Sequence, residues 1–432
     1  MRGSTWCSSE AGFGLGSSSG APGAMEPEEK MSGQSGGPSL ENDRVTTIAI
    51  GGDLCPVFRA EELFIRGDVA AIFSDLASDF GRADLSIANL ECPLVMTPSP
   101  VNRAGPVLGA SAMCIKGIAG AGIGVLNLAN NHVLDHGAQG LSSTIETCAQ
   151  AGLAVFGAGR SLEEAGAVLV REVNGVRVGM LGLAQHEFST AGPKAPGANP
   201  IDLRRVFRSV SQGKGSWDFL IMLVHAGTEG YPYPSPRLVE LCRTLVEIGA
   251  GLVVCQHSHC PGCYEAYLGS LIVYGQGNLI FDWVPNPGGP WNQGFLVKVV
   301  INGARLRDFE LIPHCQSVDS AGATRMGPGE AAALLAEVEA RSREIAEPGA
   351  VERLWREHCL EAAGGYYQLL LGNRFRHRIA RALFERLGLD WHPMDHRRRL
   401  LLGNLLRCED HREALETILL GADVEDSGDE RG

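Results

Sequence analysis

Short apolar runs alternate with segments of helical periodicity from about residue 45 to about residue 315. This alternation predicts a layered α/β domain. The apolar runs predict strands at residues 46–50, 85–88, 124–128, 154–156, 176–183, 219–224, 251–255, 270–274 and 295–301. Apolar residues recurring every three or four positions predict helices at residues 61–80, 137–151 and 236–248.

Two Asn-Gly pairs indicate how some of these strands are joined. Asn174-Gly175 and Asn302-Gly303 each lie between apolar runs. Asn-Gly is a strong signal for a two-residue hairpin turn, and a hairpin joins antiparallel strands. We therefore expect a mixed sheet arrangement rather than a purely parallel one.

The two ends of the chain differ from this central part. Residues 1–44 are rich in Gly, Ser, Pro and Glu and residues 421–432 are acidic, so we expect both to be disordered tails. After about residue 316 the chain becomes arginine-rich and helical, with expected helices at residues 329–347, 351–371, 373–387 and 397–419. The predicted organisation is an α/β domain at residues 45–315 and a small helical C-terminal domain at residues 316–420.

Charge restricts the classes of partner. The chain has 37 Lys and Arg against 50 Asp and Glu, a net charge of −13, which argues against a general nucleic-acid binder. An anionic substrate stays compatible with this balance if a metal ion supplies local positive charge. The C-terminal arginines are predicted to be a solvated helix surface, and a nucleic-acid patch is the least favoured interpretation. They are Arg374, Arg376, Arg378, Arg381, Arg397, Arg398 and Arg399.

Cysteine usage and hydropathy bear on location. The twelve cysteines are scattered, and Cys92, Cys242 and Cys255 lie within apolar runs. Buried thiols in a reducing compartment explain this better than a disulfide framework. The first 30 residues have no apolar segment of the kind that secretory leaders carry, and no stretch approaches the roughly 18 apolar residues of a membrane span. We expect a cytoplasmic protein without a membrane span.

Five predicted strands end in side chains that can bind a metal ion. These side chains are Asp53, Glu91, Asn131, His225, His257 and His259. The carboxyl ends of neighbouring parallel strands in an open α/β sheet meet at one crevice, so adjacent parallel strands would bring the six together. Carboxylate, amide and imidazole ligands suit Zn, Mn, Fe or a similar divalent ion.

Each signal has a plainer structural explanation when it stands alone. Gly52-Asp53 is commonly a turn or a helix cap, and a buried histidine such as His225 is more often a hydrogen-bonded core residue. His257-x-His259 is the strongest single signal, because alternation would point both imidazoles to one side of an extended segment. The conjunction of five such strand ends favours a shared metal site.

A rival metal site would use cysteines. Cys260-Pro261-Gly262-Cys263 has the spacing of a zinc knuckle, and the two histidines lie just upstream. A structural zinc site normally takes a second pair at similar spacing, and the sequence has no second Cys-x-x-Cys. The zinc knuckle is therefore less favoured than the site at the strand ends.

Six segments together resemble the bacterial CapA-type capsule-synthesis family, which is associated with poly-γ-glutamate. They are Gly-Asp at 52–53, Asn-Leu-Glu-Cys-Pro-Leu at 89–94, Ala-Asn-Asn-His-Val-Leu-Asp-His-Gly at 129–137, His-Ala-Gly-Thr-Glu at 225–229, Gln-His-Ser-His at 256–259 and Gln-Gly-Asn-Leu-Ile-Phe at 276–281. The likeness covers residues 46–282, and the segment at 129–137 is its most specific part. That family looks like a relative of the calcineurin-like metallophosphoesterases, which implies a mixed β-sheet sandwich flanked by helices and a two-metal site.

The resemblance implies a role for each motif residue. The first metal would be bound by Asp53 and His259, the second by Asn131, His225 and His257, and Glu91 would bridge the two. His132 would contact the scissile group or protonate its leaving group, with Asp135 orienting the imidazole. Candidate substrate contacts are Asn89, Glu229 and Asn278.

The chain departs from the phosphoesterase pattern at its first motif. Where those enzymes have Asp-x-His, this chain has Asp53-Leu54-Cys55. Cys55 is either a substitute ligand or, more simply, a buried structural thiol. Ala226 and Gln256 replace a tryptophan and a glycine of the CapA-type family. These differences affect the substrate that the resemblance implies more than the metal site that it implies.

Two functions fit these observations. The leading hypothesis is a metal-dependent hydrolase with one or two divalent ions (Mn, Fe, Zn or Mg) that acts on an anionic or γ-glutamyl substrate, at a phosphoester or at a peptide-like amide. The alternative is a non-catalytic partner in capsule polysaccharide assembly that binds a metal or a polymer, with the C-terminal helical domain contacting another protein.

Overall fold

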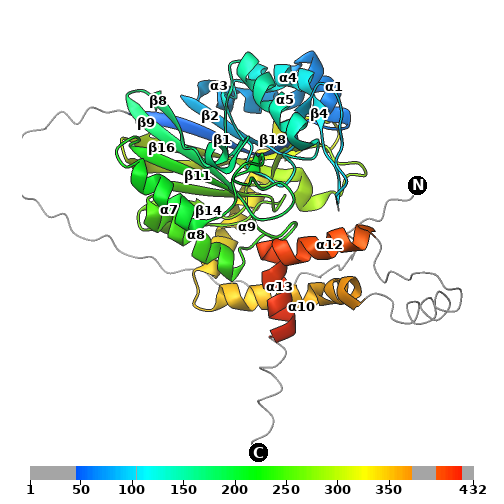
Figure 1. Cartoon of the computed structure of the whole chain (residues 1–432). Helices are drawn as coiled ribbons and strands as arrows, with labels where there is room; N and C mark the ends of the chain where they lie inside the picture. The colour runs from blue at the N-terminus through cyan, green and yellow to red at the C-terminus, as the bar shows by residue number, and fades with distance from the viewer. Residues whose placement is uncertain (1–44, 104, 372–395, 421–432) are drawn as a thin grey trace, which may run out of the picture. The chain divides into compact units, whose positions relative to one another are not determined.

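Two β-sheets packed face to face form the centre of the computed structural model, which describes residues 45–103, 105–371 and 396–420 (Figure 1). The first sheet has the order β18 (Ala323–Arg325), β17 (Arg305–Gln316), β16 (Gln293–Asn302), β1 (Val45–Cys55), β2 (Leu85–Leu90), β5 (Val125–Asn127) and β6 (Ala154–Phe156). β15 (Asn278–Phe281) also pairs with the end of β1. The strands from β1 to β6 in this order are parallel, and β16 to β18 are antiparallel.

The second sheet has the order β13 (Tyr264–Tyr267), β14 (Ser270–Val273), β12 (Leu252–Gln256), β11 (Phe219–His225), β9 (Val176–Ala184) and β8 (Leu169–Val173). Its four central strands are parallel and its two edge strands are antiparallel. Two small pairings lie outside the sheets: β3 (Leu94–Val95) with β4 (Ala110–Ser111), and β7 (Ala158–Gly159) with β10 (Gly197–Ala198). The two main sheets are therefore both mixed.

Strand alternation explains the layers. In β1, Ile48 and Ile50 point into the core between the sheets, whereas Ala49 and Leu54 face the helices outside. The outer face of the first sheet is covered by α1 (Arg59–Arg66), α2 (Val69–Phe73), α3 (Ala77–Arg82), α4 (Ile115–Gly120) and α5 (Gly137–Gln150), with 3₁₀ turns η1 (Ser74–Leu76) and η2 (Ala112–Cys114). α7 (Leu203–Gln212) and α8 (Pro236–Ile248) cover the second sheet. Because both faces of each sheet are buried, the central strands are almost continuously apolar.

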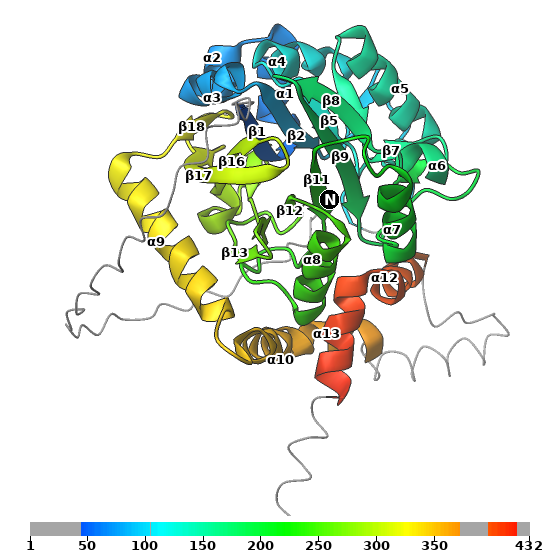
Figure 2. The same ribbon diagram turned by 90° about the vertical axis from the view of Figure 1, so that its left-hand side faces the viewer.

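α6 (Leu162–Ala165) and η3 (Gly289–Asn292) lie within the sequence of the sandwich. The remaining helices come after it. α9 (Pro328–Ile345) lies against β17 and β13, where Leu334 and Val338 enter the core between the sheets (Figure 2). α10 (Ala350–Leu371) and α13 (Glu409–Leu420) pack on each other through Trp355, Cys359, Ala414 and Ile418, and α12 (His396–Arg407) precedes α13. The division into an α/β domain and a separate helical domain stays a prediction.

The predicted fold class, a mixed β-sheet sandwich flanked by helices, is confirmed. All nine predicted strands are present, and Asn174 and Gly175 form the β8–β9 turn with φ of 51° and 75°. The second Asn-Gly pair likewise joins β16 to β17. The predicted helix at 373–387 and both tails lie outside the described residues.

Two predicted helices are wrong as single elements. Residues 61–80 form α1, α2, η1 and α3, because Gly67 ends α1 in the left-handed region at φ 67° and the Asp68 carboxylate caps α2. Residues 397–419 divide into α12 and α13, with Cys408 between them. Helical periodicity does not register such breaks, because the apolar face continues across each of them.

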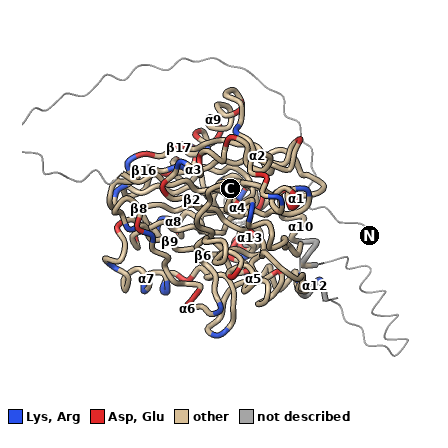
Figure 3. Tube along the Cα trace, turned by 90° about the horizontal axis from the view of Figure 1, so that it is seen from above, with Lys and Arg blue, Asp and Glu red and all other residues tan. Residues whose placement is uncertain are grey.

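Charged residues of both signs are interspersed over the described chain (Figure 3). Arg397 is exposed, whereas Arg374, Arg376, Arg378 and Arg381 lie outside the described residues, as do the side chains of Arg398 and Arg399. Among the helices that are described, none combines the length and apolar character needed to cross a membrane.

Candidate metal centre

The ends of β1 and β15 run side by side and bring Asp53 to the site. A Cβ at Gly52 would lie 2.0 Å from the carbonyl oxygen of Gly277, so only glycine permits this close approach. Asp53 is then paired in register with Asn89 of β2 on one side and with Asn278 of β15 on the other. The Gly-Asp signal therefore marks a crowded strand end and not a surface turn.

Asp53 links the two sheets. Its Oδ1 accepts a hydrogen bond of 2.7 Å from the Asn89 side chain, and its Oδ2 accepts one of 3.1 Å from the backbone N–H of His257. Burial alone would raise the pKa of Asp53, but the hydrogen bond from His259, the nearby His225 and the Asn89 amide lower that pKa to about 2. Asp53 is therefore a fully buried, ionised and well-bonded carboxylate.

Glu91 is the opposite case. Both of its carboxylate oxygens are buried, and neither accepts a hydrogen bond from any described residue. The nearest imidazole nitrogens are His225 Nε2 at 3.3 Å and His259 Nε2 at 3.7 Å from Oε1. Burial, with the charge of Asp53 next, raises the pKa of Glu91 well above its ordinary value. A buried carboxylate without a donor is costly, so this position fits a cation.

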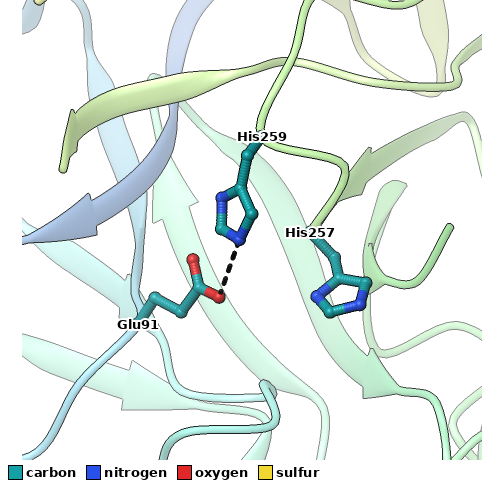
Figure 4. A group of neighbouring side chains, drawn as sticks. All are labelled: Glu91, His257 and His259. Carbon is teal, nitrogen blue, oxygen red and sulfur yellow. Dashed lines mark ion pairs between the residues drawn. The ribbon is translucent and has the colours of Figure 1, made fainter. Parts of the chain in front are cut away.

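The second sheet supplies the imidazoles. β11 ends at His225, and the chain after β12 turns through His257 and His259, which have φ of 95° and 53°. The sequence predicted that an extended segment would point both imidazoles to one side. The segment is instead a turn, so that explanation is wrong. The turn nevertheless brings both rings to Glu91 (Figure 4). Non-glycine residues hold such positive φ values only where surrounding contacts enforce them, which is common at functional sites.

Three ligand-competent atoms lie close to His225 Nε2. His225 Nε2 lies 3.3 Å from Glu91 Oε1, 3.2 Å from Asn131 Oδ1 and 3.1 Å from His257 Nδ1. Ligand atoms that share a metal at about 2.0–2.2 Å are separated by about 2.8–3.6 Å in tetrahedral or octahedral geometry. Burial lowers the pKa of both His225 and His257 to about 4, so both imidazoles are neutral at pH 7 and can each offer a lone pair.

The predicted first-metal residues also lie close to one another. His259 places Nδ1 2.9 Å from Asn278 Oδ1 and 3.4 Å from Asp53 Oδ2, whereas its other nitrogen faces Glu91. Burial lowers the pKa of His259, but Glu91 and Asp53 outweigh it and raise that pKa to about 10. His259 is thus an imidazolium between two carboxylates in this geometry.

The cysteine alternatives receive no support. Burial, together with neighbouring Cys92 and the site carboxylates, raises the pKa of Cys55 well above its ordinary value, as expected for a structural thiol. Burial also raises the pKa of Cys260 to about 12 and that of Cys263 further. Among the described residues, the two groups with metal-binding geometry are Glu91–His257–His259 and Asp53–Glu91–His225, and neither includes a cysteine.

The five ligand-bearing strands do not belong to one sheet. β1, β2 and β5 are adjacent and parallel in the first sheet, and β11 and β12 are adjacent and parallel in the second. The expectation of a single sheet edge is corrected to two edges, which face packing places together. The six predicted metal ligands are nevertheless all buried around this point.

His132 lies against Asp135 as expected. Their Nδ1 and Oδ2 atoms are 2.6 Å apart, and the same Asp135 oxygen accepts a hydrogen bond of 2.7 Å from the Leu108 backbone. Arg103 donates to the other oxygen of Asp135 and, at 2.7 Å, to the carbonyl of Asn131. The sequence-based prediction missed Arg103, because residues 96–109 carry no strand-end motif.

The three predicted substrate contacts differ in accessibility. Asn89 and Asn278 are fully buried, and they bond site side chains: Asn89 donates to Asp53, and Asn278 accepts from His259. Glu229 is exposed in the loop after β11. Its charge bears on the pKa of Glu91, which places it near the site. Glu229 is therefore the accessible one of the three.

Glu187 was missed altogether. It follows β9, its Oε2 accepts a hydrogen bond of 2.9 Å from Asn131, and its Oε1 lies 3.6 Å from His257 Nε2. Burial would raise the pKa of Glu187, but His257, the Asn131 hydrogen bond and Arg103 lower it to about 2. The signal was present, because 176–183 is one more apolar run followed by polar residues, Gln185-His186-Glu187.

Comparisons with known proteins agree with the motif pattern. Residues 47–283 match the family described as bacterial capsule synthesis protein PGA_cap. The chain is 30% identical over 251 residues to the capsule biosynthesis protein CapA of Bacillus anthracis, covering 56% of this chain and 61% of that protein. It is 28% identical over 245 residues to the PGA biosynthesis protein CapA of Bacillus subtilis, covering 56% and 64%. The chain thus spans less than two thirds of the length of these relatives.

More distant likenesses include a mycobacterial protein and two solved structures. The probable polyglutamine synthesis accessory protein of Mycobacterium tuberculosis is 31% identical over 172 residues, 37% of this chain and 45% of that one. A hypothetical protein from Thermus thermophilus is 16% identical with a TM-score of 0.41, covering 62% and 98%. A putative 5′-nucleotidase from Staphylococcus aureus is 14% identical with a TM-score of 0.39, covering 68% and 58%. These TM-scores are too low to carry an argument.

Proposed function

The chain belongs to the bacterial capsule synthesis protein family PGA_cap, and from that membership and its buried ligand set we propose that it is a metal-dependent hydrolase. Its relatives are named for capsule, PGA or polyglutamine synthesis. The substrate we propose is accordingly an anionic glutamate polymer or its precursor, cleaved at a γ-glutamyl amide. A phosphoester is the second bond type that the site chemistry suits.

One observation carries the proposal: Glu91 is a fully buried carboxylate without a hydrogen-bond donor among the described residues, and the imidazole nearest to it, that of His225, is neutral. We propose a single divalent ion held by Glu91, Asn131, His225 and His257. Two imidazole nitrogens with two oxygens favour Zn, Mn or Fe over Mg, which prefers oxygen ligands and water.

The ion and the protein side chains have separate tasks in this proposal. When bound, a divalent ion lowers the pKa of a coordinated water and polarises the oxygen of the bond under attack. His132 donates a proton from Nε2 to the leaving group, because its Nδ1 is engaged by Asp135. Asp135 stays in place because Arg103 and the Leu108 N–H both donate to it. Asp53, held by Asn89 and the His257 backbone, fixes the two sheet edges relative to each other.

The test combines metal analysis with a substrate panel. Wild-type protein purified without chelators is expected to contain about one Zn, Mn or Fe per chain by elemental analysis. It is expected to hydrolyse a γ-glutamyl oligomer, and His132→Asn is expected to lose that activity while keeping its metal. The panel includes a phosphomonoester and a phosphodiester, so that the bond type is decided by the same experiment.

Two outcomes would overturn the proposal in different ways. Wild type without bound metal after gentle purification and after incubation with Zn, Mn or Fe salts removes the metal centre itself. Wild type that binds metal but cleaves no member of the panel, with His132→Asn behaving identically, favours a non-catalytic metal- or polymer-binding partner in capsule assembly.

A further inference from the structure

The first turn of α13 contacts the loop that carries Glu187. Glu409 accepts a hydrogen bond of 2.7 Å from the backbone N–H of His186, and its other oxygen lies 2.5 Å from the His186 Nδ1. Cys408, buried at the start of this turn, donates its thiol to Glu187 Oε1 at 3.8 Å. A helix that begins more than 220 residues after this loop is thus bonded to it at three points.

The same helix also contacts the loop after β11. Asp410 accepts a hydrogen bond from the Thr228 hydroxyl, and Glu413 accepts one of 2.5 Å from Ser235. α13 therefore spans the two loops that follow β9 and β11, at the edge of the second sheet where His225 lies. In Figure 2, α13 lies beside α8 at this end of the second sheet.

Glu187 connects this contact to the ligand set. Its Oε2 accepts from the Asn131 side-chain amide, which leaves Asn131 Oδ1 directed at His225 Nε2. Its Oε1 accepts a hydrogen bond of 3.1 Å from the Gln185 side-chain amide, and the nitrogen of that amide also lies 3.0 Å from His257 Nε2. Glu187 therefore contacts Asn131 directly and reaches His257 through the Gln185 amide.

We propose that Glu187 is a positioning residue for the metal ligands Asn131 and His257, and that the first turn of α13 holds it in place. The C-terminal helices are then a structural part of the metal centre. This inference rests on the proposed metal site. It gives the C-terminal segment a role that neither the family match, which ends at residue 283, nor the motif pattern assigns.

The experiment is a Co²⁺ titration of the full-length, metal-free protein at pH 7, read by the visible absorption of the bound ion. We expect Glu187→Gln to weaken Co²⁺ binding by about 10–100-fold and to change the spectrum, because the Asn131 amide and the Gln185 amide that faces His257 both lose a charged acceptor. Glu187→Asp, which keeps the charge on a shorter side chain, should lie between it and wild type. Glu409→Gln should weaken binding in the same direction by a smaller factor.

The matched control lies on the same helix. Glu416 pairs with Arg237 at 2.6 Å, and both side chains are about half exposed. Neither Glu187 nor Thr228 is among its described partners. Glu416→Gln should bind Co²⁺ as wild type does. Circular dichroism of each metal-free variant shows whether it is folded, and Glu409→Gln carries the test if Glu187→Gln does not fold.

The outcomes separate this inference from the proposed function. Wild type that binds no Co²⁺ overturns the metal site and with it the proposed function. Wild type that binds, with Glu187→Gln giving the same affinity and spectrum, overturns the positioning role of Glu187 alone. Glu409→Gln that matches Glu416→Gln, while Glu187→Gln is weakened, overturns the part assigned to α13.

Discussion

The two sheets contribute different chemistry to the candidate centre. The strand ends of the first sheet supply oxygen atoms, from Asp53, Glu91 and Asn131. Those of the second sheet supply imidazole nitrogens, from His225, His257 and His259. Neither edge alone offers a complete ligand set, so the packing of one sheet on the other creates the site.

The two edges are also supported differently. On the oxygen edge, Asp53 is bonded by Asn89, whereas Glu91 has no donor among the described side chains and backbone groups. On the nitrogen edge, His259 faces the Asn278 amide and His257 faces Glu187. The oxygen edge therefore holds a buried carboxyl group without a donor, and the nitrogen edge holds two neutral imidazoles, those of His225 and His257. That difference is expected of a site built for a cation.

The largest effect should come from removing a nitrogen ligand. His257→Ala is expected to abolish stoichiometric metal binding, because it removes one of the four proposed ligand atoms, which lies 3.1 Å from His225 Nε2. Elemental analysis after gentle purification measures this. The control is His136→Gln. His136 is a histidine outside the predicted ligand set, and its ring accepts a hydrogen bond from the Ser99 backbone. Equal metal content in His257→Ala and wild type would show that the His257 imidazole is not a metal ligand.

The next effect separates chemistry from binding. His132→Asn is expected to reduce hydrolysis of the responsive substrate by about 10²–10⁴-fold, the usual contribution of a general acid. Its metal content should stay that of wild type, because His132 lies against Asp135 and is not one of the four proposed ligands. A loss of metal in this variant would instead make His132 a ligand.

Removing charge from the oxygen edge should have two opposite consequences. Glu91→Gln is expected to lose metal affinity, yet to raise the melting temperature of the metal-free protein at pH 8 by a few degrees. The folded-state pKa of Glu91 is raised, so wild type loses stability as the pH rises from the ordinary carboxyl pKa through the folded value, whereas Gln does not. The gain should vanish below about pH 4. A lower melting temperature at pH 8 would mean that Glu91 has a donor after all.

The smallest effect is expected at the contact with α13. Burial, together with the charges of Glu413, Glu187 and Glu229, raises the pKa of Asp410 to about 7 despite the Thr228 hydrogen bond. Wild type should therefore lose stability between about pH 4 and pH 7. Asp410→Asn should melt slightly higher than wild type above pH 7 and equally below pH 4, measured in metal-free protein. A lower melting temperature above pH 7 would show that the ionised carboxylate stabilises the contact.

Much of the fold was predictable because a buried strand is a short apolar run in the sequence. Apolar runs located the nine predicted strands, and Asn174-Gly175 located a hairpin. The breaks at Gly67 and Cys408 were missed because an apolar face continues across each. The assignment of strands to two sheets was beyond such reasoning, since it depends on pairings such as that of Asp53 with Asn278, which lie far apart in the sequence.

The candidate ligands could be predicted from the sequence, whereas the residues that support them could not. The candidate ligand residues stand where apolar strands end, so their position along the chain marked them. The supporting residues do not share that mark: Arg103 comes from an irregular segment, and Glu409 belongs to a helix beyond the sandwich. Their roles come from tertiary contacts, and only the strand-end position of Glu187 could have been noticed in the sequence.

Anomalous diffraction from crystals of protein purified with its native metal would locate the bound ion. One strong peak is expected between the two sheet edges, within about 2.0–2.3 Å of a Glu91 oxygen, Asn131 Oδ1, His225 Nε2 and His257 Nδ1. Metal-loaded crystals with no peak there, or with the peak at Cys260 and Cys263, would contradict the proposed metal centre.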